Sequence, residues 1–185
     1  MALSSTTPFP MPPPAAPTDT TPTTRERILT VAERLFADQG YNGVSLRTIT
    51  AAAEANMASI HYYFGTKPAL LQAIFDRRAQ PLSDERARNL AEAIAAAPNG
   101  IPQVRAVLAA FVGPGIRLGA TEEGAVFNRL SAVCSVDPDP DVKRIVFGVH
   151  DAAAKPFVEA LRRACPDVSD EAFYVQVQCV FVHAW

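Results

Sequence analysis

The chain has 185 residues, of which 49% are apolar, and a formal net charge of −2. A chain of this length can bury the core of one or two small domains, and its near-neutral charge excludes a polycation that coats nucleic acid without selectivity. The sequence contains no unbroken apolar run of roughly eighteen residues, so we expect no membrane-spanning helix and no membrane partner.

Cysteine usage favours a reducing environment. The three cysteines are widely spaced and form no Cys-x-x-Cys unit (Cys134, Cys165, Cys179). This pattern predicts neither a disulfide framework nor a zinc site, and the cytoplasm is the simplest location for the chain.

The first 23 residues contain seven prolines among threonine, serine and alanine. Because they lack a basic segment followed by an apolar one, they are not expected to be a signal peptide. We expect residues 1–23 to form a disordered Pro/Thr-rich tail.

Charge is uneven beyond the tail. Residues 25–80 carry seven Lys or Arg against five Asp or Glu, whereas residues 81–185 carry ten against thirteen. The N-terminal part is therefore the end that a phosphate backbone would tolerate, although its surplus is small.

Four helices are predicted before residue 81. The first has an apolar stripe, is capped by Thr23 or Thr24, and stops at Gly40 (Ile28, Leu29, Ala32, Leu35, Phe36). Ser45 caps a second helix, Asn56 a third and Thr66 a fourth. No convincing strand-like alternation appears anywhere, so the sequence predicts an all-α protein.

The C-terminal part is also predicted to be helical, with interruptions at prolines. Pro81 is expected to kink or divide the fourth helix, Pro114 to break a helix opened by Pro102, and Pro156 to interrupt one over 140–164. Another helix is expected near 122–135. The last begins at Ser169 and is still running at Trp185, which indicates that the natural chain continues.

Residues 45–67 are the most informative stretch. They read as two short helices joined by a tight turn, and the second carries small, polar and aromatic side chains in place of a continuous apolar face. A helix of this composition on a compact helical support suits insertion into the major groove of DNA.

Three separated motifs, Ala32–Tyr41, Ser45–Ile49 and Ser59–Lys67, resemble the TetR/AcrR family of one-component transcriptional regulators. The resemblance implies a helix-turn-helix DNA-binding domain over 24–70 and a larger helical ligand-binding and dimerisation domain over 71–185. It also implies a regulator, expected to be a repressor, that a small molecule releases from a palindromic operator. The family homodimer is built on the last two helices, and only the first of them is expected in this chain.

Roles in DNA binding divide into two sets. Contacts to phosphate are expected from Ser45, Arg47, Tyr62, Tyr63 and Lys67, and base readout from Asn56, Met57, Ala58, Ser59 and His61. Ser45 and Asn56 also suit plain helix caps, Tyr62 or Tyr63 could belong to the core, and His61 could be an exposed residue without a role.

Two positions depart from the family pattern. Glu54 stands where glycine is common in the turn between the second and third helices, which places strain and a negative charge near DNA. Pro68 replaces an acidic residue at the start of the fourth helix, where proline is tolerated.

An effector pocket is expected in the C-terminal part, with Phe111, Arg117, Phe127, Leu130, Phe147 and His150 as candidate lining residues. The aromatic and aliphatic members equally suit ordinary core. The segments Phe127–Leu130 and Pro156–Arg163 are similar to the branch of the family that senses fatty acids or acyl-CoA, so the effector is expected to be small and apolar, with an acyl chain as one candidate.

Other function classes have little support. Nucleophile, zinc-protease and phosphate-loop motifs are missing from the sequence, so we expect no enzyme, no cofactor and no metal site. The alternative to a regulator is a helical protein–protein adaptor with a non-functional DNA module, for which Glu54 is the only indication.

Overall fold

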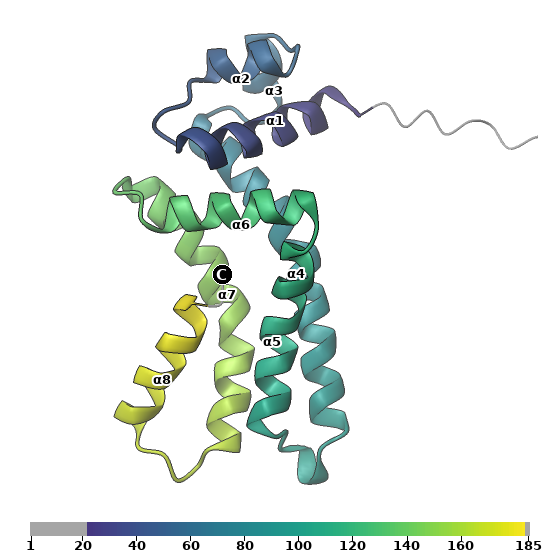
Figure 1. Cartoon of the computed structure of the whole chain (residues 1–185), viewed down its shortest axis with the longest axis vertical. Helices are drawn as coiled ribbons and strands as arrows, with labels where there is room; N and C mark the ends of the chain where they lie inside the picture. Colours follow the sequence, from purple (N-terminus) through teal and green to yellow (C-terminus); the bar gives the residue numbers. More distant parts are fainter. Residues whose placement is uncertain (1–21, 184–185) are drawn as a thin grey trace, which may run out of the picture.

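The computed structural model describes residues 22–183, apart from the side chains at 150, 152 and 179–183. All regular structure within this range is helical, which confirms the all-α prediction (Figure 1). The tail predicted over 1–23 lies outside the described residues, except for its last two positions.

The N-terminal part consists of α1 (Thr24–Gln39), α2 (Leu46–Ala52), α3 (Met57–Tyr63) and the beginning of α4 (Lys67–Ala95). A 3-10 turn, η1 (Pro98–Gly100), follows. The remaining helices are α5 (Val104–Gly119), α6 (Glu122–Ser135), α7 (Pro140–Ala164) and α8 (Asp170–His183). In Figure 1, α6 crosses beneath α1, while α4, α5 and α7 run downward from it and α8 lies beside α7.

The predicted N-caps are confirmed for all four N-terminal helices. The side chains of Thr23, Ser45, Asn56 and Thr66 each accept a hydrogen bond from a backbone N–H in the first turn. Each bond satisfies one of the amides that a helix start leaves without an internal partner. Gly40 ends α1 with a φ of 75° and an N–H bond to the carbonyl of Phe36, as expected.

The expectation that prolines divide the helices is wrong, whereas the kink that was the alternative at Pro81 stays a prediction. Helix α4 runs unbroken past Pro81, α5 past Pro114, and α7 past Pro156. An internal proline removes one backbone hydrogen bond and costs about 3 kcal/mol, but packing on both sides of the proline can offset that cost. Pro114 illustrates this, since it is itself buried one turn beyond the buried ring of Phe111.

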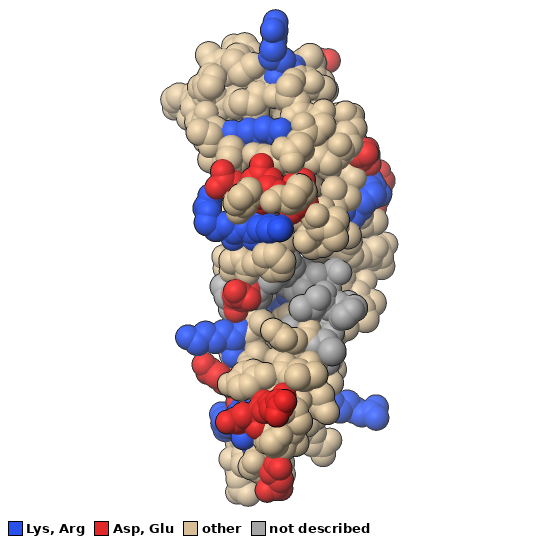
Figure 2. All heavy atoms as spheres, turned by 90° about the vertical axis from the view of Figure 1, so that its left-hand side faces the viewer, with Lys and Arg blue, Asp and Glu red and all other residues tan. Residues whose placement is uncertain are grey.

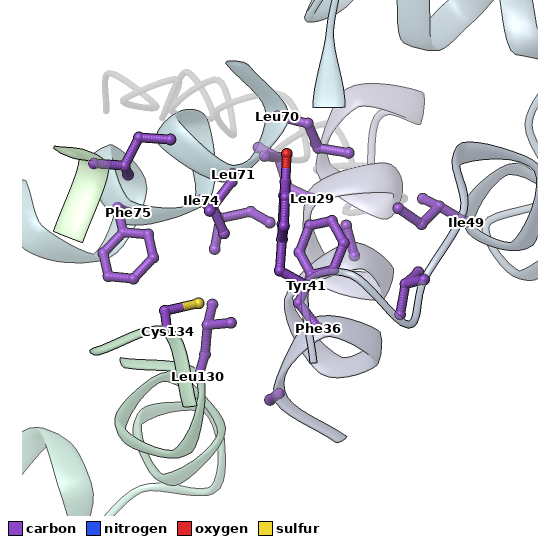
Figure 3. Packing of buried hydrophobic residues seen from close by; sticks show 14 of the residues in the cluster. Leu29, Phe36, Tyr41, Ile49, Leu70, Leu71, Ile74, Phe75, Leu130 and Cys134 are labelled. Carbon is purple, nitrogen blue, oxygen red and sulfur yellow. The ribbon is translucent and has the colours of Figure 1, made fainter. Parts of the chain in front are cut away.

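The larger hydrophobic cluster joins the N-terminal helices to the C-terminal part. Side chains of α1, α2, α3 and the start of α4 meet Phe127, Leu130 and Cys134 of α6 and the first turns of α7 (Figure 3). The rings of Phe75 and Phe127 pack edge to face at 5.4 Å. The domain boundary predicted at residues 70–71 therefore falls inside a continuous helix and a shared core.

A second, smaller cluster holds the lower parts of α4, α5 and α7 together with α8. Phe111 and Phe157 pack edge to face at 5.0 Å in its centre. Arg86 is buried beside them, with its Nε donating to the carbonyl of Phe111 and its guanidinium 3.9 Å from the Phe111 ring. Burial lowers the pKa of Arg86 to about 10.

Ion pairs connect α1, α4 and α6 across the junction between the two parts. Glu33 of α1 is buried and pairs with both Arg77 and Arg78 of α4. Arg78 also pairs with Glu123 of α6 at 2.8 Å, and Arg77 with Glu26 of α1 at 3.4 Å. We call these five residues the Glu33 cluster. It ties one turn of α4 to the N-terminal helices by charge as well as by apolar packing.

Among the described residues, no helix taken alone is long and apolar enough to cross a bilayer. Helices α5 and α6 reach the required length and composition only as a pair, and they are bent by 112° at their junction.

Candidate nucleic-acid interface

Helices α2 and α3 are joined by a turn that contains Glu54 in a left-handed conformation, with a φ of 49°. The turn is closed by backbone bonds from Glu54 to Ala51 and from Ala55 to Thr50, at 3.4 and 3.0 Å. The strain expected at Glu54 is therefore present, because a side chain with a Cβ disfavours this region of φ. Arg27 of α1 supports the turn by donating to the carbonyl of Ala53 at 3.4 Å.

Helix α3 is fixed to the support by one side and exposed on the other. Ile60 is completely buried in the larger cluster, whereas Ala58, His61 and Tyr62 are exposed, and Met57 and Ser59 are half-buried. A short helix held by a single apolar anchor presents its remaining side chains outward. This geometry suits a helix that enters a groove.

The polar side chains at the start of α3 bond to one another. The side-chain carbonyl oxygen of Asn56 accepts from the backbone N–H and from the hydroxyl of Ser59, at 2.8 and 2.9 Å. Asn56 is thus a helix cap, which was one of the two roles expected for it. It also orients Ser59 on the exposed side of the helix. The hydroxyl oxygen of Ser59 keeps its acceptor capacity for a base edge.

His61 is oriented by the turn that follows α3. Its Nδ1 lies 3.1 Å from the carbonyl oxygen of Gly65. Because a carbonyl can only accept, Nδ1 carries the proton in this bond, and the neutral ring then has Nε2 as an acceptor. An acceptor in this position can pair with the exocyclic amino group of adenine or cytosine.

Four of the five residues expected to contact phosphate have exposed side chains. Ser45, Arg47, Tyr62 and Tyr63 are exposed, and the two tyrosine rings pack edge to face at 5.0 Å. Tyr62 is 83% exposed, which removes it from the core, and Tyr63 is 41% exposed. Both hydroxyl groups can therefore reach a backbone that passes the end of α3.

The ammonium group of Lys67 packs against aromatic rings of the protein and does not point outward, as a phosphate contact would. Its Nζ is 4.2 Å from the centre of the Tyr41 ring and 5.7 Å from that of Phe36. Burial lowers the pKa of Lys67 and raises that of Tyr41 to about 12. The ammonium packs on aromatic faces, and it would have to rotate away from them to reach a phosphate.

One basic residue was missed in the sequence. Arg25, at the start of α1, has its guanidinium 5.6 Å from the ring of Phe64, directly after α3, and it also pairs with Glu26. The wide separation of Arg25 and Phe64 along the chain conceals this proximity. Only the packing of α1 against α3 brings a second arginine to the end of α3.

The charge distribution agrees with a DNA-facing end. Figure 2 shows that one face of the N-terminal end is largely uncharged and carries isolated Lys and Arg side chains, with both signs of charge gathering in a band below. Within residues 45–67 the charged side chains are Arg47, Glu54 and Lys67. Glu54 is thus the one acidic residue within this stretch.

Comparison with known proteins accounts for this geometry. Residues 28–74 match the family model of tetR-type bacterial regulatory proteins, and residues 109–182 match the tetracyclin repressor-like C-terminal domain. The chain belongs to the TetR family. The predicted resemblance is therefore confirmed, and it extends beyond the three N-terminal motifs into the C-terminal part.

Two curated relatives align with part of the chain. A protein described as an uncharacterized HTH-type transcriptional regulator in the dhlA 5′ region of Xanthobacter autotrophicus is 30% identical over 93 residues, which is 50% of this chain and 45% of that protein. The HTH-type transcriptional repressor NicS of Pseudomonas putida is 34% identical over 53 residues, which is 29% of this chain and 25% of that protein. The chain therefore spans less than half the length of these relatives.

Solved structures of TetR-family proteins share the fold over most of the chain. The SmeT–triclosan complex has a TM-score of 0.66 and 19% identity, covering 87% of this chain and 76% of that one. PfmR from Thermus thermophilus has a TM-score of 0.58 and 20% identity, covering 86% and 82%. At this identity the likeness establishes the arrangement of helices.

The candidate effector residues are not gathered around one cavity. Phe127 and Leu130 lie in the larger cluster and Phe111 in the smaller one, so all three contribute to core packing. Arg117 is exposed and pairs with Glu85 of α4, and Phe147 is exposed on α7. The side chain of His150 lies outside the described residues.

A cavity of about 260 Å³ that is open to solvent, with Asp76 and Gln80 exposed, lies instead between α4 and α7. The residues that line it were not among the sequence-based candidates, because neither small nor polar residues on a helix indicate a cavity (Asp76, Ala79, Gln80, Ser83, Val149, Ala153). No three histidine, cysteine or acidic side chains converge on a possible metal position within the described part of the chain.

Proposed function

We propose that this TetR-family protein is a sequence-specific DNA-binding transcriptional regulator whose α3 enters the major groove. The single observation that supports this most is the division of α3 into one buried anchor, Ile60, and an outward set of small and polar side chains. Base readout would come from Asn56, Met57, Ala58, Ser59 and His61. Ser45, Arg47, Tyr62 and Tyr63 would contact phosphate, joined by Arg25 and, after rotation of its side chain, Lys67.

We further propose that it acts as a repressor and as a homodimer on a palindromic operator in the cytoplasm. Two copies of α3 would have to be about 34 Å apart to enter successive major grooves on one face of DNA. Dimer contacts are expected through the C-terminal helices, where Tyr174 and Val175 of α8 expose apolar surface. Release from DNA would follow from any change in that separation.

Helix α4 is the element that can transmit such a change. It begins directly after the recognition helix and continues for 29 residues into the C-terminal part. The Glu33 cluster fixes one turn of α4 to α1, so a displacement of that turn moves the whole N-terminal part with it. An effector would shift the equilibrium from the DNA-bound to the released conformation only by binding the released conformation more tightly.

The effector is proposed to be a small molecule with an apolar portion, bound in the C-terminal part. An acyl chain remains one candidate for that portion. Phe111, Phe127, Leu130 and Phe147 would contribute to such a site only after the helices separate, since the first three now pack in the core.

A mobility-shift assay with a salt titration tests the function. The probe is the intergenic DNA beside the gene that encodes the chain. Its binding by the original protein is compared with its binding by the variant Arg47→Ala. We expect a shifted band whose affinity falls with salt, and a slope that is reduced by about one in Arg47→Ala. A protein that shifts no DNA at low salt would favour the adaptor alternative over this proposal.

A further inference from the structure

We propose that the cavity between α4 and α7 is a binding site for a small organic cation that carries a short apolar chain, with Asp76 as the residue that selects the charge. The inference rests on the proposed function only where it gives this ligand the role of an effector. The binding site itself is argued from the walls of the cavity.

The α4 wall presents a carboxylate and two further polar groups to the cavity. Asp76, Gln80 and Ser83 are spaced by four and seven residues, which places them on one face of the helix. Gln72 donates to Asp76 Oδ1 at 2.8 Å and holds the carboxylate in position. A carboxylate fixed in this way is a strong acceptor for an ammonium group.

The charge of Asp76 is available to a ligand. None of the ion pairs formed by the described side chains includes Asp76. The neighbouring Arg77 and Arg78 are both committed to Glu33 on another side of α4. By contrast, Glu26, Glu33 and Glu123 each face an arginine.

The opposite wall is apolar and small. Val149 and Ala153 of α7 face the cavity, and Ala79 of α4 completes the apolar surface. The volume of about 260 Å³ corresponds to the space of about nine water molecules in the liquid, which suits an amine of about seven heavy atoms. A carboxylate on one wall and alkyl surface on the other match an alkylammonium ion, and they disfavour an anion.

The same turn of α4 faces both the cavity and the Glu33 cluster. Asp76, Ala79 and Gln80 line the cavity, while the intervening Arg77 and Arg78 hold Glu33 of α1. A ligand that moves this turn therefore acts directly on the contact between α4 and the DNA-binding helices. This arrangement gives the bound cation a route to the recognition helix.

Calorimetric titration of the full chain with three six-carbon probes tests the inference. Hexylammonium, 1-hexanol and hexanoate share one alkyl chain and differ in charge. We expect hexylammonium to bind about threefold more tightly than 1-hexanol, as an ion pair with the exposed Asp76 provides, and hexanoate to bind least. Equal affinity for the three probes, or a preference for hexanoate, would overturn the proposal.

Two variants locate the binding site. Asp76→Asn should remove the preference for hexylammonium, and Ala153→Leu, which fills the cavity, should weaken the binding of all three probes. Asp84→Asn is the matched control, because Asp84 accepts from Gln80 as Asp76 does from Gln72 but does not line the cavity. A loss of preference in Asp84→Asn equal to that in Asp76→Asn would contradict the assignment.

These titrations contain no DNA, so their outcome does not depend on whether the proposed DNA-binding function is correct. A protein that prefers hexylammonium but shifts no DNA supports this binding site and contradicts the regulator role. A protein that shifts DNA but shows no preference among the probes contradicts this inference alone. Melting curves of each variant by circular dichroism establish that the fold is retained.

Discussion

The carboxylate of Glu33 accepts two hydrogen bonds from Arg78, one from Nε to Oε1 at 2.9 Å and one from Nη2 to Oε2 at 3.0 Å. This bidentate pair joins α1 of the DNA-binding part to α4, and the side chain of Glu33 is only 2% exposed. Since Arg78 also holds Glu123 of α6, one guanidinium contacts both parts of the protein. The hydrogen bond from Arg78 is the main cause that lowers the pKa of Glu123.

Removing the charge of Glu33 should destabilise the fold. Glu33→Gln leaves Arg77 and Arg78 without their buried counter-ion, and breaking a buried pair in this way costs about 3 kcal/mol of unfolding free energy. Chemical denaturation measures the change. Glu123→Gln is the control, because an exposed partner contributes at most about 1 kcal/mol. Equal losses in the two variants would contradict a dominant role for Glu33.

The turn before α3 offers a substitution that should increase stability. Glu54 adopts a φ of 49°, which costs a residue with a Cβ about 1 kcal/mol, whereas glycine adopts it without that cost. Part of the gain is offset by the freedom of glycine in the unfolded chain. We expect Glu54→Gly to raise the unfolding free energy by about 0.5 kcal/mol. Denaturation curves would contradict the argument if Glu54→Gly were less stable than the original chain.

The charge of Glu54 should act separately from its conformation. Glu54→Gln keeps the strained turn but removes a negative charge close to phosphate, so DNA affinity should rise at low salt and the gain should shrink as salt increases. Fluorescence anisotropy over a salt series measures this. Comparable affinities for Glu54→Gln and the original chain at low salt would place Glu54 away from DNA.

Base-reading and phosphate-contacting residues should differ in how their variants bind a panel of related duplexes. His61→Ala and Ser59→Ala should change the order of preference among duplexes, with about 1–3 kcal/mol at the positions they read. Tyr62→Phe removes one exposed hydroxyl and should weaken binding to every duplex alike. If His61→Ala and Ser59→Ala lower all affinities uniformly, the assignment of these two residues to base readout is wrong.

Alkaline pH should destabilise the larger hydrophobic cluster through Cys134. Burial, with a smaller effect of Asp137, raises the pKa of Cys134 from its ordinary value of 9.0 to about 12. A raised folded-state pKa stabilises the protein below pH 9, and this contribution is lost as pH rises from about 9 towards 12. Cys134→Val, which cannot ionise, should retain more of its stability over this range in urea denaturation, whereas Cys165→Ser should not. The same loss in all three proteins would rule out Cys134 as the source.

Local signals were the part of the fold that could be predicted from the sequence. Caps such as Asn56 and Thr66 act within one helical turn, so their residue types predict where α3 and α4 begin. The effect of the prolines was predicted wrongly because the hydrogen bond that a proline removes can be read from the sequence, whereas the packing against other helices that offsets this loss cannot. Pro114 lies in the same helix as Phe111 and is itself buried, and no pattern in the sequence predicts that packing.

The candidate site was predictable to a similar extent. The exposed face of α3 follows from the spacing around Ile60, which lies within a single helix. The positions of Lys67 over Tyr41 and of Arg25 beside Phe64 depend on contacts between segments far apart in the chain. The cavity beside Asp76 depends on the angle between α4 and α7, so composition alone does not reveal it.

The central claim is that α3 reads a DNA sequence, and selection of bound duplexes from a random pool tests it most directly. We expect the full chain to enrich a two-fold symmetric motif with half-sites about one helical turn apart, and His61→Ala to enrich a motif changed at matching positions in both halves. The claim would be contradicted if the full chain enriched no motif. It would also be contradicted if the full chain, His61→Ala and a variant with Asn56, Ser59 and His61 all replaced by alanine enriched the same motif.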